Sequence, residues 1–269
     1  SSDKIEYNNG TVNLKYYIQW TQVSSTVNSE NKSFEFVIKA EGINTKYNSS
    51  TLSNEGIDVY VDGEKIENAT IDVSEPTEID NGIQYKVTVS NIAEDLILNN
   101  NKYRDWSGHL SIGIKPRMAL DKYGHGNIEN RIGDEFFDYI KPEIFYNYSD
   151  TVIDKVNKKL LVKFDITDKY FSESKLSVGD ISATLNDVLL DETHINSNQI
   201  SKTLSQPTQI KATVNGEEKV IGAEYTLTLQ WKTEVPEYSG IVKLRIPRGA
   251  GKDTSENVSD EKTITVGVD

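Results

Sequence analysis

Two acidic loops of the chain carry the residue types that bind calcium. Asp121 and Asn127 lie in the first, DKYGHGN, and Asp253 and Asn257 lie in the second, DTSEN. Calcium takes about six to eight oxygen ligands, and neither loop has the dense alternation of acids found in an EF-hand. Asp and Asn side chains also hydrogen-bond the backbone of their own turn. We therefore expect turn stabilisation at these four residues, with a calcium site as the alternative and no other cofactor.

The histidines offer a second possible metal site. His109 lies in a predicted strand and His125 lies in the loop that follows it. Two neutral imidazoles and a carboxylate can bind zinc. The third histidine, His194, is distant in the sequence. We expect ordinary surface histidines here, with zinc as the alternative.

Acidic residues also gather near the middle of the chain, at Asp134, Glu135, Asp138 and Glu143. Calcium could stiffen a joint between domains at this place. The run of several Asp and Asn residues that marks a cadherin-type linker is absent, so a solvated linker is the favoured interpretation.

The sequence contains no motif typical of an enzyme. Its 42 acidic residues make carboxylate pairs common by abundance alone, so such pairs do not indicate a glycosidase. There is no Gly-x-Ser-x-Gly elbow and no glycine-rich loop that opens a helix to hold phosphate. The absence of cysteine excludes disulfides, thiolate metal sites and thiol nucleophiles. We predict a protein without enzymatic activity.

Two further kinds of side-chain chemistry stay open. Trp20, Trp106 and Trp231 could stack on sugars, although packing is the commoner role of such residues. Lys163 and Asn257 are residue types that form an internal amide cross-link when a buried acid lies beside them.

The charge of the chain disfavours two classes of partner, nucleic acids and anionic membrane surfaces. The net charge is −13 and the isoelectric point is about 4.8. A DNA duplex carries one phosphate charge per ~1.7 Å and requires a basic surface, and an anionic membrane surface has the same requirement. No run of about 18 apolar residues could cross a bilayer. We expect neither nucleic-acid binding nor membrane insertion by this segment.

The apolar residues that must build the fold repeat with a period of two. The alternation is clearest at residues 12–20, 34–38, 57–61, 85–89 and 110–114. It predicts strands with one buried face. Asp62-Gly63 predicts a hairpin turn, and residues 91–98 are the best candidate for a short helix. The fold class is therefore all-β, a sandwich or a barrel.

The second half of the sequence repeats the first. SEPTEI at 74–79 recurs as SQPTQI 131 residues later, and YKVTV at 85–89 matches YTLTL 140 residues later. The segment GHLSIGIKPRMALD, which ends at Asp121, matches GIVKLRIPRGAGKD, which ends at Asp253. The matches keep one order while their spacing drifts, which indicates two copies of one fold with insertions.

The boundary between the copies follows from this alignment. Lys141-Pro142 comes after the strand-like EFFDYI, and proline favours an extended linker. We place domain 1 at residues 1–140, with a less typical N-terminal strand region, and domain 2 at residues 141–269. Asp138 corresponds to Asp269, so we expect a longer array in which neighbouring repeats of the same chain are partners.

The ordered motifs of the second copy resemble those of a known family. They are Leu176-Ser177 before a strand, the strand that begins at Tyr225, Gly240, Ile246-Pro247 and the Asp253 loop, where Glu256 replaces a usual glycine. The chain is thereby similar to the tandem immunoglobulin-like domains of Gram-positive bacterial surface proteins. The resemblance implies two tandem immunoglobulin-like β-sandwich domains.

The same resemblance implies a place and a role. The chain would be extracellular, on the cell surface or in the cell wall, and would act as an adhesion module or a rigid spacer. A host or matrix protein or a cell-surface glycan would be its partner. The alternative is a pair of carbohydrate-binding modules attached to a secreted glycan-active enzyme.

Overall fold

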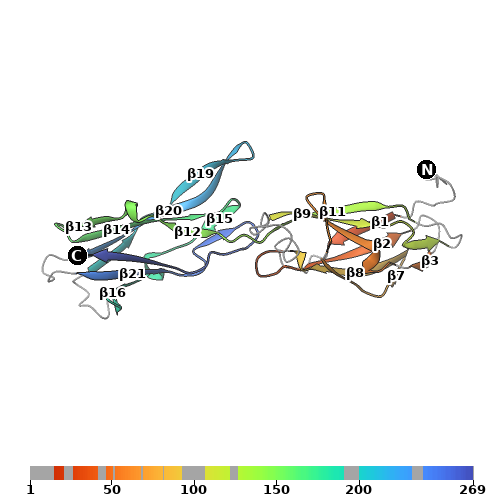
Figure 1. The fold of residues 1–269 in the computed structure, drawn as a ribbon, viewed down its shortest axis with the longest axis horizontal. Coiled ribbons are helices and arrows are strands. Elements are labelled where there is room, and N and C mark those ends of the chain that lie inside the picture. Colours follow the sequence, from red (N-terminus) through yellow and green to blue (C-terminus); the bar gives the residue numbers. More distant parts are fainter. Residues whose placement is uncertain are drawn as a thin grey trace. The chain divides into compact units, whose positions relative to one another are not determined.

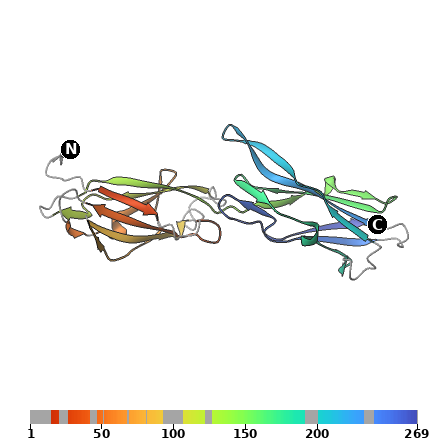
Figure 2. The ribbon, with the colours of Figure 1, turned by 180° about the vertical axis from the view of Figure 1, so that it is seen from behind.

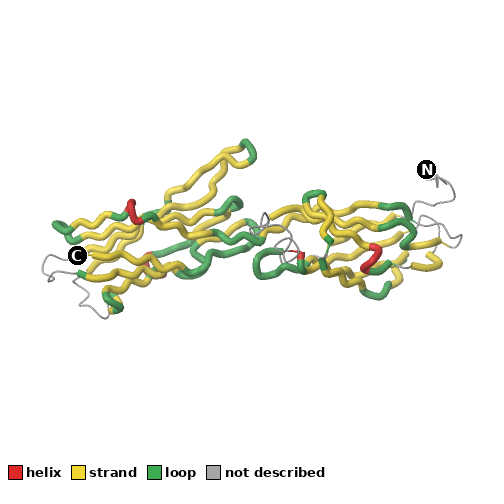
Figure 3. Tube along the Cα trace, viewed as in Figure 1, coloured by secondary structure: helices red, strands yellow, loops and turns green. Residues whose placement is uncertain are grey.

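The computed structural model divides into two compact units, residues 1–140 (unit 1) and 141–269 (unit 2). It describes residues 15–20, 27–41, 47–50, 52–67, 69–80, 82–92, 107–121, 127–190, 200–231 and 239–268. Nearly all regular structure in these ranges is antiparallel strand, drawn yellow in Figure 3, so the predicted all-β fold class is confirmed. Within the described ranges, no helix has the length and apolar character needed to cross a bilayer.

The described residues of unit 1 form two larger sheets and one strand pair (Figure 1). The first sheet has the order β1 (Lys15–Trp20), β2 (Phe34–Glu41), β8 (Gly82–Ser90) and β6 (Thr70–Val73), and β7 (Thr77–Ile79) also pairs with β8. The second has the order β11 (Asn130–Asp138), β9 (Ser107–Ile114), β4 (Ile57–Val61) and β5 (Glu64–Ile66). The pair is β3 (Tyr47–Ser50) with β10 (Ala119–Asp121), and a 3₁₀ turn, η1 (Asn54–Gly56), precedes β4.

Unit 2 has the same layout. Its first sheet has the order β12 (Glu143–Tyr146), β14 (Lys159–Thr167), β20 (Glu217–Trp231) and β18 (Ile200–Leu204), with β13 (Val152–Asp154) on β14 and β19 (Thr208–Val214) on β20. Its second has the order β17 (Val188–Leu189), β16 (Ser182–Leu185), β21 (Gly240–Ile246) and β23 (Lys262–Val268). The pair is β15 (Phe171–Ser174) with β22 (Gly251–Asp253), and the 3₁₀ turns are η3 (Tyr148–Asp150) and η4 (Val178–Asp180).

Each unit has its own hydrophobic core between its two larger sheets. Strand β14 buries Leu160, Val162, Phe164 and Ile166 and turns the residues between them outward. In unit 1, the rings of Phe34 on β2 and Phe137 on β11 meet edge to face at 5.4 Å. Burying a side chain of this size stabilises a fold by about 1.5–3 kcal/mol. The period-two pattern of the sequence therefore becomes a sandwich-like core in each unit.

Tight turns with left-handed backbone join the hairpins. Asp62 and Gly63 have φ values of 47° and 82° and connect β4 to β5, so the hairpin predicted at this dipeptide is confirmed. Asn186 and Asp187 connect β16 to β17 in the same way, with φ values of 49° and 65°. Of the helix expected at residues 91–98, residues 93–98 lie outside the described ranges.

The two units share the register of their strands. Val73 pairs with Val87 in unit 1, and Leu204 pairs with Leu227 in unit 2. The residue that follows each strand is a serine. The hydroxyl oxygen of Ser74 or Ser205 accepts the backbone N–H of Lys86 or Thr226 at 2.8 Å. Sequence positions that match at offsets of 131 and 140 residues therefore occupy the same places in the two sheets.

A nine-residue difference between those offsets appears as a longer hairpin in unit 2. Ile79 pairs with Gly82 across a two-residue connection in unit 1. The equivalent pair in unit 2 is Ile210 with Gly222, and residues 211–221 extend the hairpin between them to a turn at Asn215 and Gly216. The β19–β20 hairpin projects from its sheet in both views of the ribbon (Figures 1 and 2).

Candidate functional site

The short β15–β22 pair of unit 2 places Asp253 in a buried loop. Asp253 ends β22 and lies opposite Phe171 across a register shift, and its side chain is fully buried. In unit 1, Asp121 lies opposite Tyr47 across a similar shift. The predicted equivalence of the two aspartates therefore holds for their backbone positions. The side chain of Asp121 lies outside the described part of the structure.

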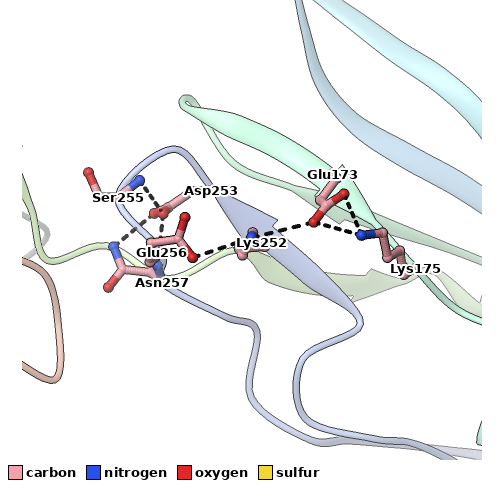
Figure 4. A network of polar contacts seen from close by, with 7 residues as sticks. All are labelled: Glu173, Lys175, Lys252, Asp253, Ser255, Glu256 and Asn257. Carbon is pink, nitrogen blue, oxygen red and sulfur yellow. Dashed lines mark hydrogen bonds and ion pairs between the residues drawn. The ribbon is translucent and has the colours of Figure 1, made fainter. Parts of the chain in front are cut away.

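The carboxylate of Asp253 is held by its own loop (Figure 4). Oδ1 accepts the backbone N–H groups of Ser255 at 2.8 Å and Asn257 at 2.9 Å, and Oδ2 accepts Nδ2 of Asn257 at 2.8 Å. Glu256 in this loop has a φ of 65°, in the left-handed region that residues other than glycine seldom adopt. These contacts support the interpretation of Asp253 and Asn257 as turn-stabilising residues.

A second carboxylate, that of Asp168, lies beside Asp253. Asp168 directly follows β14 and is 8% exposed, and its Oδ1 accepts the backbone N–H of Tyr170 at 2.6 Å. Its own N–H donates to the carbonyl of Ile221 at 2.8 Å. Carboxylate oxygens of Asp168 and Asp253 lie within 4.8 Å of each other. The fold thus brings together two buried acids that are 85 positions apart in the sequence.

Burial and mutual repulsion make ionisation of this pair costly. Burial raises the pKa of Asp168 to about 6, the Tyr170 N–H opposes that shift, and the charge of Asp253 adds to it. Burial also raises the pKa of Asp253, against the hydrogen bonds from Asn257 and Ser255. Two carboxylates this close favour either a proton or a cation between them.

The pair offers part of a cation site. Asp168 and Asp253 could together supply up to about four oxygens, whereas calcium takes about six to eight. Three of the lone pairs on Asp253 already accept hydrogen bonds from the loop. The arrangement therefore suits a shared proton at least as well as a metal ion.

An exposed chain of ion pairs runs along the same strand pair (Figure 4). Lys252 Nζ lies 3.4 Å from Glu173 and 3.3 Å from Glu256, and Lys175 lies 3.0 Å from Glu173. The carboxylate of Glu256 is the main cause of a raised pKa at Lys252. Such exposed pairs each contribute little to stability, so they order the surface of the loop rather than build a site.

Asn127 is buried but does not match Asn257 in position. Its Oδ1 accepts the N–H of Met118 at 2.6 Å, and its Nδ2 donates to the carbonyls of Lys115 and Ile128. The residue in this position in unit 2 is Ser259, because its carbonyl accepts the N–H of Gly249 as the carbonyl of Asn127 accepts that of Arg117. The hydroxyl of Ser259 accepts the N–H of Gly251 at 3.0 Å. Asn127 and Asn257 therefore occupy different positions in the two units.

Of the three histidines, His109 is the one that lies in the described part of the structure. Its Nδ1 lies 2.9 Å from Oδ1 of Asp134, and both side chains are more than half exposed. His125 and His194 lie outside the described ranges, so the structure does not test the zinc alternative at these two residues.

Acidic residues near position 140 are interpreted from the sequence as a linker. Of these, Asp138 accepts the backbone N–H of Ile140 at 2.9 Å.

The remaining candidates have separate surroundings. Trp231 is 2% exposed and belongs to the core of unit 2, as its predicted packing role requires. Trp106 and the side chain of Trp20 lie outside the described part of the structure. Lys163 is exposed and faces Glu224 at 3.8 Å, whereas the amide of Asn257 bonds to Asp253. These two contacts do not join Lys163 to Asn257, the two residues considered for an amide cross-link.

Asp168 was not predicted from the sequence as a site residue. Its only local signal is an acid at the end of an alternating apolar run, in the segment DITD. Such acids are common in turns, and the partnership with Asp253 arises from the pairing of β15 with β22. Comparison with known protein families finds no match for the chain, and comparison with curated proteins finds none either.

Proposed function

We propose that the chain is a non-enzymatic segment of a bacterial cell-surface protein. Its two units would be immunoglobulin-like modules that separate a further domain from the cell surface or take part in adhesion. The strand orders β12-β14-β20-β18 and β16-β21-β23 support the module assignment, because they follow the ABED and CFG sheets of that fold. Unit 1 has the corresponding orders β1-β2-β8-β6 and β4-β9-β11.

The observation that carries the structural role is the path of the chain through unit 2. Lys141 begins the unit, and its Nζ lies 3.0 Å from Asp260, two residues before β23. Strand β23 then runs to Val268 and pairs with β21 along its whole length. At about 3.3 Å per residue, the chain leaves roughly 20 Å from its entry. In Figure 1 the C mark lies at the β13 end of unit 2, opposite β15.

This path suits a module that is loaded from its two ends. A unit entered at one end and left at the other adds its own length to a polypeptide. The terminal strands β12 and β23 lie in different sheets and pair with β14 and β21. Because interstrand hydrogen bonds lie perpendicular to the strands, a pull along β12 and β23 loads these bonds together rather than one after another.

Single-molecule force spectroscopy of the 269-residue chain tests this role. With handles at the two termini, we expect two separate unfolding events, each releasing about 400 Å of chain. The chain has no cysteine, so one introduced cysteine can place a handle at Asn157, in the turn between β13 and β14. Pulling between Asn157 and the C-terminus loads unit 2 differently and should unfold it at lower force. Equal forces in the two geometries would contradict the proposal.

A second function is favoured by exposed aromatic rings. Phe145 on β12 and Tyr148 in η3 are 52% and 60% exposed. An exposed ring offers an apolar face on which a sugar could stack, as the alternative of a carbohydrate-binding module requires. Binding of the chain to a panel of neutral glycans, lost in Phe145→Ala, would replace the structural proposal with this one.

A further inference from the structure

An exposed apolar strip lies along one edge of the first sheet of unit 2. Phe145, Tyr148 and Val152 are 52%, 60% and 51% exposed. They lie on β12, η3 and β13, which follow one another along the same side of β14. Among the described residues, β12 and β13 pair only with β14. This edge, which we call the Phe145 edge, therefore presents large apolar groups beside unpaired strand backbone.

The register of the sheet places two carboxylates in line with Phe145. Phe145 lies directly opposite Asp165 on β14, and Asp165 lies directly opposite Glu224 on β20. Directly opposed residues project from the same face of a sheet with Cβ atoms about 5 Å apart. The outward face thus carries a row of one ring and two acids. Opposed like charges destabilise a sheet, so this row costs the isolated unit some stability.

Negative charges outnumber positive charges around the row of Phe145, Asp165 and Glu224. Burial is the first cause of a raised pKa at Asp165, and the charges of Glu224 and Asp150 raise it further. Lys163 is the cation that opposes this shift, and its Nζ lies 3.8 Å from Glu224. Three carboxylates against one ammonium group leave this patch with a net negative charge beside the exposed ring.

We propose that the Phe145 edge docks a basic extended segment of a partner polypeptide. A lysine or arginine stem would lie over Phe145 with its charged head toward Asp165, the next residue in the row. Aromatic faces attract such cations, and a cation there relieves the repulsion between the two acids. The backbone of the segment would pair with the free edge of β12, as in other cases of strand addition.

The charge of the row distinguishes this partner from the other classes. A neutral glycan could stack on Phe145 but would leave the opposed carboxylates unrelieved. An anionic partner would be repelled by the row and by the net charge of −13. The docking role goes beyond the structural role proposed above, which stands whether or not this edge binds a partner.

Titration of the full chain with a synthetic peptide tests the docking role. The probe is an acetylated peptide of about eight alternating Lys and Thr residues, followed by amide chemical shifts and calorimetry. We expect shifts confined to residues 143–152, 161–165 and 224–226, and affinity that falls as salt rises. Phe145→Ala should weaken binding by about tenfold or more. Ile241→Ala, an equally exposed apolar residue on β21, is the matched control and should bind like the parent chain.

A second variant separates docking from folding. Asp165→Asn removes the opposed charge, so it should raise the melting temperature of unit 2 while weakening peptide binding. Loss of binding in both Phe145→Ala and Ile241→Ala, or shifts spread over the whole acidic surface, would overturn the proposal. Binding of a neutral oligosaccharide such as cellohexaose at the same residues, in place of the peptide, would also overturn it.

Discussion

The two units share one strand frame but differ in the residues that the sequence places around it at an equivalent position. Asp121 and Asp253 take the same backbone position, opposite Tyr47 and Phe171. In unit 2 a second acid, Asp168, directly follows β14, whereas the sequence that follows β2 in unit 1 reads GINTK at residues 42–46 and contains no acid. Among the described residues, the two units therefore share the backbone frame at this position, and the close pair of buried acids Asp168 and Asp253 is seen in unit 2.

The two units also differ in the length of one hairpin, although the strands beside it pair in the same way. Residues 80–81 join β7 to β8 in unit 1, and residues 211–221 fill the equivalent connection in unit 2. The strand pairs on either side keep their register. A hairpin at a sheet edge can lengthen outward without disturbing the core, since the added residues pair with each other.

The largest effect should come from equivalent core residues. Ile112 pairs with Val59 in unit 1, and Leu244 pairs with Ala183 in unit 2, and both side chains are fully buried. Each change to alanine should cost about 2–5 kcal/mol. Calorimetry of the full chain should show Ile112→Ala lowering one transition and Leu244→Ala lowering the other. If both variants moved both transitions equally, the separation into two cores would be wrong.

Removing the central acid of the unit 2 loop should have the next largest effect. Asp253→Ala leaves the buried donors of Ser255 and Asn257 without their acceptor, at a cost of about 2–4 kcal/mol. Asp253→Asn keeps an acceptor for the backbone donors and should cost less. Denaturant unfolding measures both, and equal losses would contradict the hydrogen-bond account.

Asp168→Asn should stabilise unit 2 in a pH-dependent way. The folded pKa of about 6 lies above the unfolded value, so the folded state keeps its proton longer and the parent chain loses stability as pH rises from about 4 to about 6. The variant should be more stable by about 1–3 kcal/mol at pH 8 and nearly equal at pH 4. Asp187→Asn, at an exposed site, is the control. A pH-independent difference would refute the raised pKa.

The smallest effect should follow from trimming the long hairpin. Replacing residues 211–221 with Asp-Asn, the pair that joins Ile79 to Gly82, gives unit 2 the connection of unit 1. An isolated two-stranded ribbon is marginally stable, so the free energy of unfolding should change by less than about 1 kcal/mol. A larger loss on denaturant unfolding would mean that the ribbon supports the core.

The sequence predicted features that depend on nearby residues. Alternation identified strands such as 57–61, and Asp62-Gly63 identified its hairpin, because both signals lie within a few positions. Ser259 takes the place of Asn127 in unit 2, since either side chain can accept a backbone N–H from the segment beside it. Residue identity is a weak guide where any short polar acceptor fits.

By itself, the sequence determined the all-β class, the alternation of buried and exposed residues and the order of the repeated motifs. These follow from backbone sterics and from the period of two, which act over short stretches. Only the tertiary structure decided that Asp168 lies against Asp253, and that Phe145, Asp165 and Glu224 form one row. Such groupings depend on which strands pair and in what register. The energy of strand pairing comes from many residues across a sheet, so no single residue in the sequence reveals it.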